Sequence, residues 1–457
     1  MQRPTLKKNE LYDTEIEDIT NEGSGVARCN GMTVFIPDTA VGDKLRCRIV
    51  KVKSSYCYGI VDELYEQGES RIKPDCPVSR QCGGCCFRHI SYDEECRIKD
   101  KFIRDSFERI GRLFPEYLPF MGCENTDNYR NKAQYPVAEL NGRAVCGFYA
   151  RRSHRVVEYH HCRLQPEIFL DILETIMAYV NIKKIPAYNE VTLQGLLRHI
   201  FIRRGEHSGE IMVCLVVTSL KKAEVFGDLP PLLVSQFKDI KTVVLNENPK
   251  NTNVILGTKL KPIYGSGEMT DVMCGNRIKL SPLSFYQVNT LQAERLYKAA
   301  ETLAELDKDD VLLDLYCGAG TIGLSMAAKV KRLMGVEMIP QAIENAKQNA
   351  LANGIDNAEF ICADAKKAAA ILYDKGVRPD VIIADPARKG CDREALEYMS
   401  KMSPKRIVMI SCNHTTAARD CAILGELGYK TEKVMGVDMF PRTGHVETVC
   451  LLTHDPC

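Results

Sequence analysis

Three side chains in the last quarter of the sequence could together carry out covalent catalysis. Cys412 and Asp385 each follow a short apolar run, and Glu447 opens the final apolar segment. A thiolate can add to an electron-poor carbon, and a carboxylate can then remove a proton so that the thiol is released. The carbon next to the attacked one then becomes electron-rich and can take a group such as the methyl of a sulfonium. These residue types therefore predict a nucleophilic cysteine and a carboxylate base beside a methyl donor.

A glycine-rich turn upstream predicts the site for that donor. Glycines are needed where the backbone passes close to a ligand, and an acid at the end of the next strand can accept hydrogen bonds from ribose hydroxyls. Glu337 meets that condition, and Asp364 ends the following apolar run, where it would meet an adenine amino group. With Gly323 the turn also spells the G-x-G-x-x-G of dinucleotide sites, but the two acids favour S-adenosylmethionine (SAM). The turn glycines expected at SAM are Gly318 and Gly320.

The order of predicted elements explains how these residues could meet. From about residue 285, long helical stretches alternate with short apolar strands, which predicts a doubly wound α/β domain. Ligands bind beyond the carboxyl ends of such strands, so Asp385 and Cys412 are expected at one edge of the sheet, with Glu447 facing Cys412. The predicted strands are 311–316, 333–337, 359–362, 380–384 and 406–410, followed by a helix at 417–427 and an antiparallel edge pair at 430–438 and 446–452.

The preceding part of the chain has a different pattern. Residues 11–65 alternate apolar and polar positions in short runs broken by glycine, which predicts a five-stranded barrel of the OB type, a fold that often binds oligonucleotides. Residues 130–265 contain strands and one or two helices. Between them, residues 91–113 are predicted to form an amphipathic helix, whose apolar positions are Ile98, Phe102, Ile103, Phe107 and Ile110.

Twenty cysteines are many for a chain of this length, and most are expected to be small buried residues. Cys76, Cys82 and Cys85 differ because they follow a C-x5-C-x2-C spacing with glycines between the last two. Cys162 offers a fourth thiolate. Four thiolates suit either a zinc ion or an iron–sulfur cluster, and the spacing alone leaves both open.

Charge and hydropathy bear on partners and location. The net charge is +1, so the electrostatics of the whole chain does not point to nucleic acid. No N-terminal segment has the pattern of a signal peptide, and no apolar run is long enough to span a bilayer. We therefore expect a cytoplasmic protein with reduced thiols, no membrane contact and no obligate protein partner.

Residues 281–457 resemble the catalytic domain of the bacterial RNA uracil-C5 methyltransferase family. The family motifs DLYCGxG, DPPR, SCNP and HVETV have counterparts that begin at Asp314, Asp385, Ser411 and His445. The resemblance implies Cys412 as the nucleophile and Glu447 as the base that removes the C5 proton. It places the following residues around SAM or the target base: Gln287, Tyr316, Glu337, Asp364 and Asp385.

Three further positions bear on this resemblance. Phe285 resembles the family's aromatic residue next to the pocket, although a core aromatic is the alternative interpretation. Ala387 and His414 stand where the family has prolines. Because both replaced residues shape the backbone, these departures concern local geometry and not the type of reaction.

The resemblance extends over nearly the whole chain. The glycine-rich residues 21–27 resemble the TRAM module of RNA-modifying enzymes. Family members with this cysteine pattern carry a [4Fe-4S] cluster, so the resemblance implies a cluster, with zinc as the alternative, on Cys76, Cys82, Cys85 and Cys162. The expected domains are a TRAM-like barrel at 1–66, a central α+β iron–sulfur and RNA-binding domain at 67–275, whose helix 91–113 could dock on the catalytic domain, and a SAM-dependent catalytic domain at 276–457.

Basic and aromatic residues interleave between positions 128 and 163, a pattern typical of surfaces that hold single-stranded RNA. A solvated strand face with core aromatics is the alternative. The residues concerned are Arg130, Lys132, Arg143, Arg151, Arg152, Arg155 and Arg163, with Tyr129, Tyr135, Phe148, Tyr149 and Tyr159.

The TRAM module and the cysteine loop together resemble the branch of the family that acts on 23S ribosomal RNA. The expected function is SAM-dependent methylation of C5 of a uridine in 23S rRNA, with the target uracil flipped out of its stack. Two alternatives stay open: methylation of a T-loop uridine in transfer RNA, and a non-catalytic RNA-binding iron–sulfur protein with a degenerate methyltransferase fold.

Overall fold

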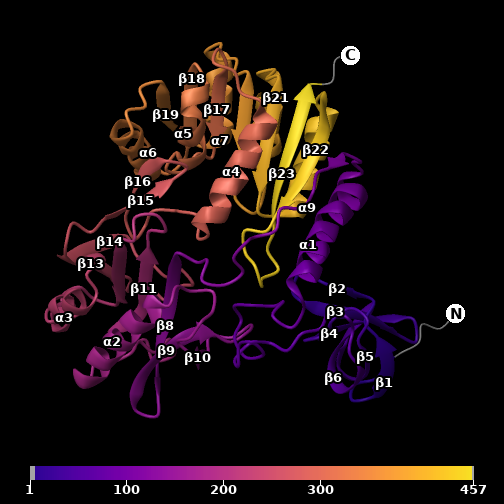
Figure 1. Cartoon of the computed structure of the whole chain (residues 1–457), viewed down its shortest axis with the longest axis vertical. Helices are drawn as coiled ribbons and strands as arrows, with labels where there is room; N and C mark the ends of the chain where they lie inside the picture. Colours follow the sequence, from indigo (N-terminus) through magenta and orange to yellow (C-terminus); the bar gives the residue numbers. More distant parts are fainter. Residues whose placement is uncertain (1–5, 455–457) are drawn as a thin grey trace.

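The computed structural model describes residues 6–454, which form a small barrel, a central sheet and a larger α/β domain (Figure 1). The barrel has six strands and not the predicted five, because a two-residue strand completes the sheet. In the order β1-β5-β6-β4-β3-β2 its strands close around buried side chains such as Val34 and Leu45. The strands are β1 Leu11–Glu15, β2 Asp18–Ile19, β3 Ser24–Cys29, β4 Met32–Pro37, β5 Lys44–Val52 and β6 Tyr56–Glu66.

A seven-stranded mixed sheet forms the central part, in the order β10-β9-β8-β11-β12-β13-β14. Its strands β11 and β12 are buried on both faces. Ile200 packs toward the covering helices, whereas the adjacent Phe201 packs toward the α/β domain, as the two-residue period of a strand requires. The elements are β8 Lys132–Leu140, β9 Arg143–Tyr149, β10 Val156–Glu158, β11 Leu197–Arg204, β12 Ile211–Val217, β13 Ile240–Glu247 and β14 Lys259–Tyr264, with helices α2 Ile168–Ile182 and α3 Leu229–Gln236.

The α/β domain is a doubly wound sheet, as predicted, and its strand order is β19-β18-β17-β20-β21-β23-β22-β7. The first five strands are parallel, and β23 is inserted antiparallel between β21 and β22. The strands are β17 Val311–Leu315, β18 Arg332–Glu337, β19 Ala358–Cys362, β20 Val381–Ala384, β21 Arg406–Ser411, β22 Tyr429–Val437 and β23 Glu447–His454, with the hairpin β15 Met269–Met273 and β16 Asn276–Leu280. The helices are α4 Thr290–Ala304, α5 Thr321–Met326, α6 Pro340–Ala352, α7 Ala365–Asp374, α8 Arg393–Lys401 and α9 His414–Glu426.

The predicted edge pair is therefore not at the edge. The short strand β7, Glu116–Tyr117, pairs in parallel with β22 and covers it. Sequence patterns could not reveal β7, because two residues carry no periodicity. The outer strand of the catalytic sheet thus comes from a segment that lies about 300 residues earlier in the chain.

Helix α1, Tyr92–Ser106, leads from the barrel to the α/β domain and lies along its side (Figure 1). Its last turn widens into a π-helical turn, Phe107–Gly111. Ile103 and Phe107 join the core that α9 and β22 form. The prediction for Ile110 was wrong: its side chain is 55% exposed, because the π turn rotates it away from the apolar side of the helix.

Candidate active site

The glycine turn after β17 has the backbone conformation that its composition predicts. Gly318 and Gly320 have φ angles of +54° and +81°, in the left-handed region that favours glycine. Tyr316 adopts φ of +67° in spite of its side chain, and such conformations cluster at ligand-binding positions. The N–H of Gly318 donates to Oε2 of Glu337 at 3.3 Å. This hydrogen bond fixes the Glu337 carboxylate against the turn.

The two predicted acids follow adjacent parallel strands, so they lie at the same edge of the sheet as the turn. Glu337 ends β18, and its Oε1 accepts the N–H of Ile339 at 3.0 Å. Asp364 comes after β19 and caps α7, where its Oδ1 accepts the N–H of Lys366 at 3.2 Å. The structure thus brings the predicted donor-binding residues together at the carboxyl ends of three neighbouring strands.

Gly323 is required by close packing beneath the turn. A Cβ atom at this position would lie 2.7 Å from Oδ2 of Asp314, which accepts the N–H of Gly323 at 2.9 Å. Burial raises the pKa of the Asp314 carboxyl to about 8. The third glycine of the G-x-G-x-x-G spacing therefore allows the helix to approach a buried acid beneath the turn.

Cys412 and Glu447 meet through the pairing of β21 with the antiparallel strand β23. Ser411 lies opposite Thr448 in this ladder. Cys412 is the residue after Ser411 and Glu447 the residue before Thr448, so the register places the thiol opposite the carboxylate. Glu447 is only 4% exposed, and Cys412 is half-buried. The extended register therefore sets Cys412 and Glu447 at the same end of two neighbouring strands.

Burial controls the titration of this group of acids. It raises the pKa of Glu447 to about 8, with a further contribution from the Asp385 charge, and raises the pKa of Asp385 to about 7. The pKa of Cys412 rises to about 11 through burial and the nearby Glu447 and Asp385. The thiol is therefore protonated at neutral pH and must lose its proton as it attacks. Asp385, Cys412 and Glu447 are close enough to influence one another electrostatically.

Arg388 supplies the cation of the site, a role that the sequence analysis did not assign. Its charge lowers the pKa values of both Cys412 and Glu447, and so opposes the effect of burial. Its Nη2 donates to Nε2 of His445 at 3.2 Å, and its carbonyl accepts from Nδ2 of Asn413 at 3.1 Å. The sequence signal that could have identified Arg388 was its place as the last residue of the segment that corresponds to the DPPR motif. Arg388 links the segment that carries the nucleophile to the segment that carries the base.

The segment ahead of α4 is anchored from the central sheet. Nδ2 of Asn131 donates to the carbonyl of Gln287 at 2.7 Å, and the fully buried Arg203 donates to the carbonyls of Ser281 and Ser284. Phe285 is 71% exposed, so the alternative of a core aromatic is wrong. The anchoring leaves this aromatic ring free to contact a ligand.

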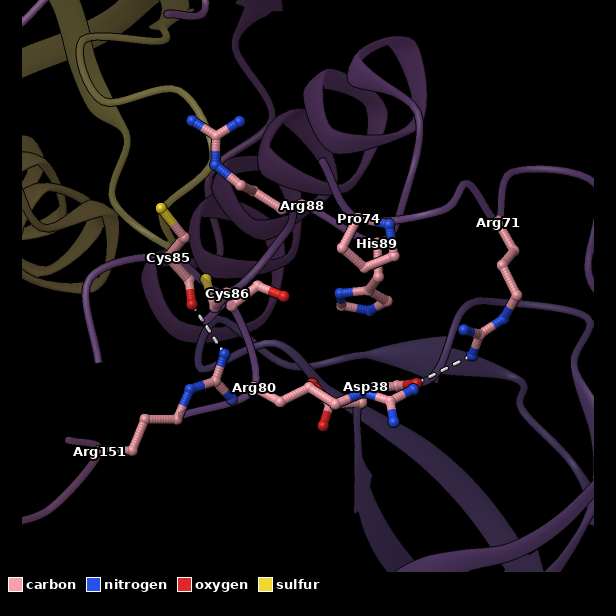
Figure 2. Close-up of a pocket in the computed structure, with 10 residues that line it drawn as sticks. Asp38, Arg71, Pro74, Arg80, Cys85, Cys86, Arg88, His89 and Arg151 are labelled. Carbon is pink, nitrogen blue, oxygen red and sulfur yellow. Dashed lines mark hydrogen bonds between the residues drawn. The ribbon is translucent and has the colours of Figure 1, made fainter. Parts of the chain in front are cut away.

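The cysteine loop docks on the hairpin of β9 and β10. Cys82 forms a β-bridge with Ala150, and the N–H of Gly83 donates to the carbonyl of Tyr149 at 2.9 Å. Figure 2 shows Arg151 of the same hairpin donating to the carbonyl of Cys85, beside Arg88 and Cys86. The cavity in this view measures about 20 Å³, room for little more than a water molecule. The loop is therefore held in place by its contacts with the β9–β10 hairpin.

The four predicted metal ligands lie in one neighbourhood. Burial raises the pKa of Cys162 to about 12, and the adjacent Cys85 and Cys82 add to that rise, while Cys76 raises the pKa of Cys82. All four are free thiols. Within residues 6–454, no set of three or more histidine, cysteine, aspartate or glutamate side chains converges closely enough to hold a single metal ion. The donor set suits thiolate ligation, because it offers four sulfurs from a loop and a neighbouring segment.

A groove of about 1190 Å³ runs between the barrel, the cysteine loop, the β9–β10 hairpin and residues 443–445. Basic and aromatic side chains line it, among them Lys51, Tyr58, Arg151 and Arg152. Its far end reaches His445, two residues before Glu447. The groove therefore borders the segment that leads to Glu447, while Cys412 and Glu447 themselves are not among its lining residues.

The residues of the predicted basic and aromatic set between 128 and 163 do not share one environment. Phe148, Tyr149, Arg151 and Arg152 line the groove, where Arg152 is ion-paired with Glu22. For Tyr129 and Tyr135 the prediction of an RNA surface was wrong, because both are core residues, 6% and 0% exposed. Arg143 and Arg163 are occupied by ion pairs with Glu158 and Asp127. Residue type alone could not separate a strand's two faces.

The fold and this site define the class: a doubly wound methyltransferase-type domain with a thiol and a carboxylate at its carboxyl edge. Family models agree. The one described as tRNA (Uracil-5-)-methyltransferase matches residues 276–455, and the one described as TRAM domain matches residues 6–61.

The chain belongs to the RNA uracil-5 methyltransferase family. It is 40% identical over 454 residues to an RNA methyltransferase of Oceanobacillus iheyensis, covering 99% of this chain and 98% of the relative. A Halalkalibacterium halodurans RNA methyltransferase is also 40% identical, over 452 residues, with the same shares covered. Among solved structures, the tRNA (uracil-54, C5)-methyltransferase of Pyrococcus abyssi, in complex with S-adenosyl-L-homocysteine, has the same fold. Its TM-score is 0.76 at 23% identity, with 97% of this chain and 100% of that chain covered.

No helix among residues 6–454 combines the length and the apolar character that a membrane crossing requires.

Proposed function

We infer that this protein methylates C5 of a specific uridine in 23S ribosomal RNA, with SAM as the methyl donor. The observation that carries the inference is the strand register that sets Cys412 opposite Glu447, with Asp385 at the same sheet edge. Uracil C5 is too weak a nucleophile to be methylated directly. A thiol and a base on one pyrimidine ring remove that difficulty.

The residues act in a defined order. Cys412 loses its proton, and its sulfur bonds to C6 of the uracil, which places an electron pair at C5. When bound, SAM supplies the methyl group that this carbon takes. Glu447 then removes the C5 proton, the C5–H electrons restore the C5–C6 double bond, and the C6–S bond breaks to release the thiolate. Arg388 assists by lowering the pKa of the attacking thiol.

The donor site is assigned to the turn and the acids around it. Two observations support this assignment: the Glu337 carboxylate holds the N–H of Gly318 in the turn, and Asp364 follows the next strand. The Pyrococcus abyssi structure contains S-adenosyl-L-homocysteine, the product that SAM leaves behind. We assign SAM contacts to Gln287, Tyr316, Gly318, Gly320, Glu337, Asp364 and Asp385.

We further assign a [4Fe-4S] cluster to Cys76, Cys82, Cys85 and Cys162, with zinc as the alternative. Such a cluster would be held by these four thiolates, which come from one loop and one neighbouring segment. The loop borders the groove through Gly83 and Cys85, whereas methyl transfer itself requires no electron carrier. The cluster would therefore shape the RNA-binding surface.

The groove is the proposed path of the RNA. Its basic side chains would meet phosphates and its aromatic rings would stack on unpaired bases, while the target uracil leaves the stack to reach Cys412. The cysteine loop together with the TRAM barrel favours 23S rRNA. Transfer RNA is the second candidate, because the family model and the Pyrococcus abyssi enzyme are both named for tRNA. A non-catalytic role is disfavoured by the paired Cys412 and Glu447.

The test is to map 5-methyluridine in rRNA and tRNA from cells with and without the gene, by mass spectrometry of nuclease fragments. Loss of one or more 5-methyluridines from 23S rRNA is the expected result. Loss confined to tRNA would transfer the assignment to the second candidate. No change in either RNA, together with no methyl transfer to either purified RNA, would leave the non-catalytic alternative.

A further inference from the structure

Residues 438–446, here called the strap, connect β22 to β23 and end beside the candidate base Glu447. In Figure 1 the strap is the yellow loop that descends from the catalytic domain toward the junction of the other two parts. It has no helix or strand of its own. Its conformation must therefore be fixed by contacts with the rest of the chain.

Helix α1 makes the most specific of those contacts. The ammonium group of Lys99 donates to Oε1 of Glu95 at 2.7 Å, to Oδ1 of Asp438 at 2.8 Å and to the carbonyl of Phe440 at 3.2 Å. All three charged side chains are 0% exposed. Tyr92, one helical turn before Glu95, donates to Oδ2 of Asp438 at 2.8 Å. Each donor of the ammonium group therefore has a partner, and two of the three lie in the strap.

Two more contacts extend this network along the strap. Oε1 of Glu95 also accepts the N–H of Arg442 at 2.6 Å. The carbonyl of Arg442 in turn accepts the N–H of Cys86 at 2.9 Å, so the cysteine loop covers the other side. A Cβ atom on Gly444 would lie 1.7 Å from the carbonyl oxygen of Asn21 in the barrel. The strap is thus enclosed by parts of the chain that precede the catalytic domain.

The other end of α1 reaches the segment that carries the nucleophile. Oγ of Ser106 hydrogen-bonds to Nδ1 of His414 at 2.6 Å. The ring of Phe102 stacks on the same imidazole, with centroids 6.0 Å apart and planes at 21°. His414 lies two residues after Cys412 and occupies a position where the family motif has proline. The departure from the motif is thus a docking point for α1.

We propose that α1 is a positioning element of the active site, which sets Cys412 and Glu447 relative to each other. It holds the base through Lys99 and the strap, and it holds the nucleophile through His414. The proposal rests on the proposed function, since it assigns α1 to the same two reacting groups. Buried ion pairs contribute little net stability compared with apolar replacements, so a fully enclosed Glu95–Lys99–Asp438 set is better explained by the geometry that it specifies.

The two ends of the helix are separable by experiment, because they serve different steps. On 5-fluorouridine RNA the enzyme can attack and methylate, but no C5 proton is present, so the covalent adduct accumulates without using Glu447. On uridine RNA the base must act before release. Lys99→Met is expected to form the fluorouridine adduct at the wild-type rate, while turnover on uridine RNA falls about 10²-fold and the adduct persists. Ser106→Ala should slow adduct formation on both RNAs.

Two further variants distinguish a specific effect of the strap contacts from general damage to α1. Arg97→Met changes the exposed side of the same helix, where the side chain is 60% exposed, and should leave both assays unchanged. Tyr92→Phe removes one hydrogen bond from Asp438 and should give a weaker form of the Lys99→Met result. It decides the question if Lys99→Met does not fold, as judged by circular dichroism.

The RNAs for this experiment are in vitro transcripts of 23S rRNA fragments and of tRNA, with adducts resolved on denaturing gels. Equal slowing of both assays in Lys99→Met and Tyr92→Phe, or no slowing in either, would overturn the proposal. If the wild-type protein forms no adduct with any fluorinated transcript, the proposed function itself has failed, a result that no variant could produce.

Discussion

The two halves of the candidate site are built in different ways. On the donor side, Gly318, Glu337 and Asp364 each follow a strand of consecutive β–α units, and their hydrogen bonds stay inside the α/β domain. On the reacting side, the segments that hold Cys412 and Glu447 contact α1, the cysteine loop and the barrel. The three donor-side residues are therefore held within one domain, whereas the segments of the candidate nucleophile and base are held by several parts of the chain.

The largest effect is expected from the reacting side. Cys412→Ala removes the only atom that can bond to C6, so methylation should fall by roughly 10⁴-fold or more, as when other nucleophiles are deleted. SAM affinity should be unchanged, because the donor residues lie on other strands. Methyl transfer to RNA and calorimetric titration with SAM measure the two quantities. Retained methylation would remove the covalent mechanism altogether.

Glu447→Gln should break the reaction at a later step. The nucleophile and methyl transfer still operate, but the C5 proton stays, so a covalent protein–RNA adduct accumulates. Turnover is expected to fall about 10²- to 10⁴-fold, the usual contribution of general base catalysis. A shifted band on a denaturing gel reports the adduct. Full turnover without any shifted band would exclude Glu447 as the base.

On the donor side, Glu337→Gln should weaken SAM binding and leave the chemistry intact. Losing charged hydrogen bonds to a ligand costs about 1.5–3 kcal/mol, which corresponds to roughly 10- to 100-fold in affinity. Calorimetric titration gives the affinity, and turnover at saturating SAM should approach the wild-type rate. If turnover at saturating SAM fell as far as in Glu447→Gln, Glu337 would act in the chemical step as well as in SAM binding, and the division of the site into a donor side and a reacting side would be wrong.

Cys162→Ala tests whether the four proposed cluster ligands contribute to RNA binding. Visible absorbance and bound iron should be lost, and affinity for a 23S rRNA transcript should weaken about tenfold through disorder of the groove wall, a loss on the scale of 1.4 kcal/mol. SAM affinity should not change. Cys214→Ala, in the core of the central sheet, is the matched control for loss of a buried thiol. Zinc in the purified protein, with no visible absorbance, would favour the zinc alternative.

The smallest effect concerns pH. Burial raises the pKa of Glu447 to about 8, so the carboxylate form that acts as the base increases about tenfold between pH 7 and pH 9. The Cys412 thiol, whose pKa is about 11, stays mostly protonated over this range and loses its proton during the attack. Turnover should therefore grow about tenfold from pH 7 to pH 9. SAM affinity does not draw on either group, so it should change no more than about twofold, the change expected from ionisation of Asp385, whose pKa is about 7. A turnover rate that declines above pH 7 would contradict the assignment of Glu447 as a base.

Much of the catalytic domain was predictable because its signals are local. The five parallel strands were predicted to within one or two residues, since apolar runs between amphipathic helices leave few alternatives. The same periodicity placed Asp385 and Cys412 at strand ends. It could not reveal β7, which is too short to have a pattern, or the burial of Tyr129 and Tyr135, whose residue type suits either a core or a stacking surface.

The sequence alone was enough to predict the family and to propose its chemistry, because the motifs around Asp314, Asp385, Cys412 and Glu447 are recognised by residue type and spacing. Only the tertiary structure decided how the nucleophile and the base are held. Lys99 looks like an ordinary helix-surface lysine in the sequence, and it is 339 residues from Asp438, to which it donates. No local pattern encodes such a contact, since it exists only once α1 has packed against the strap.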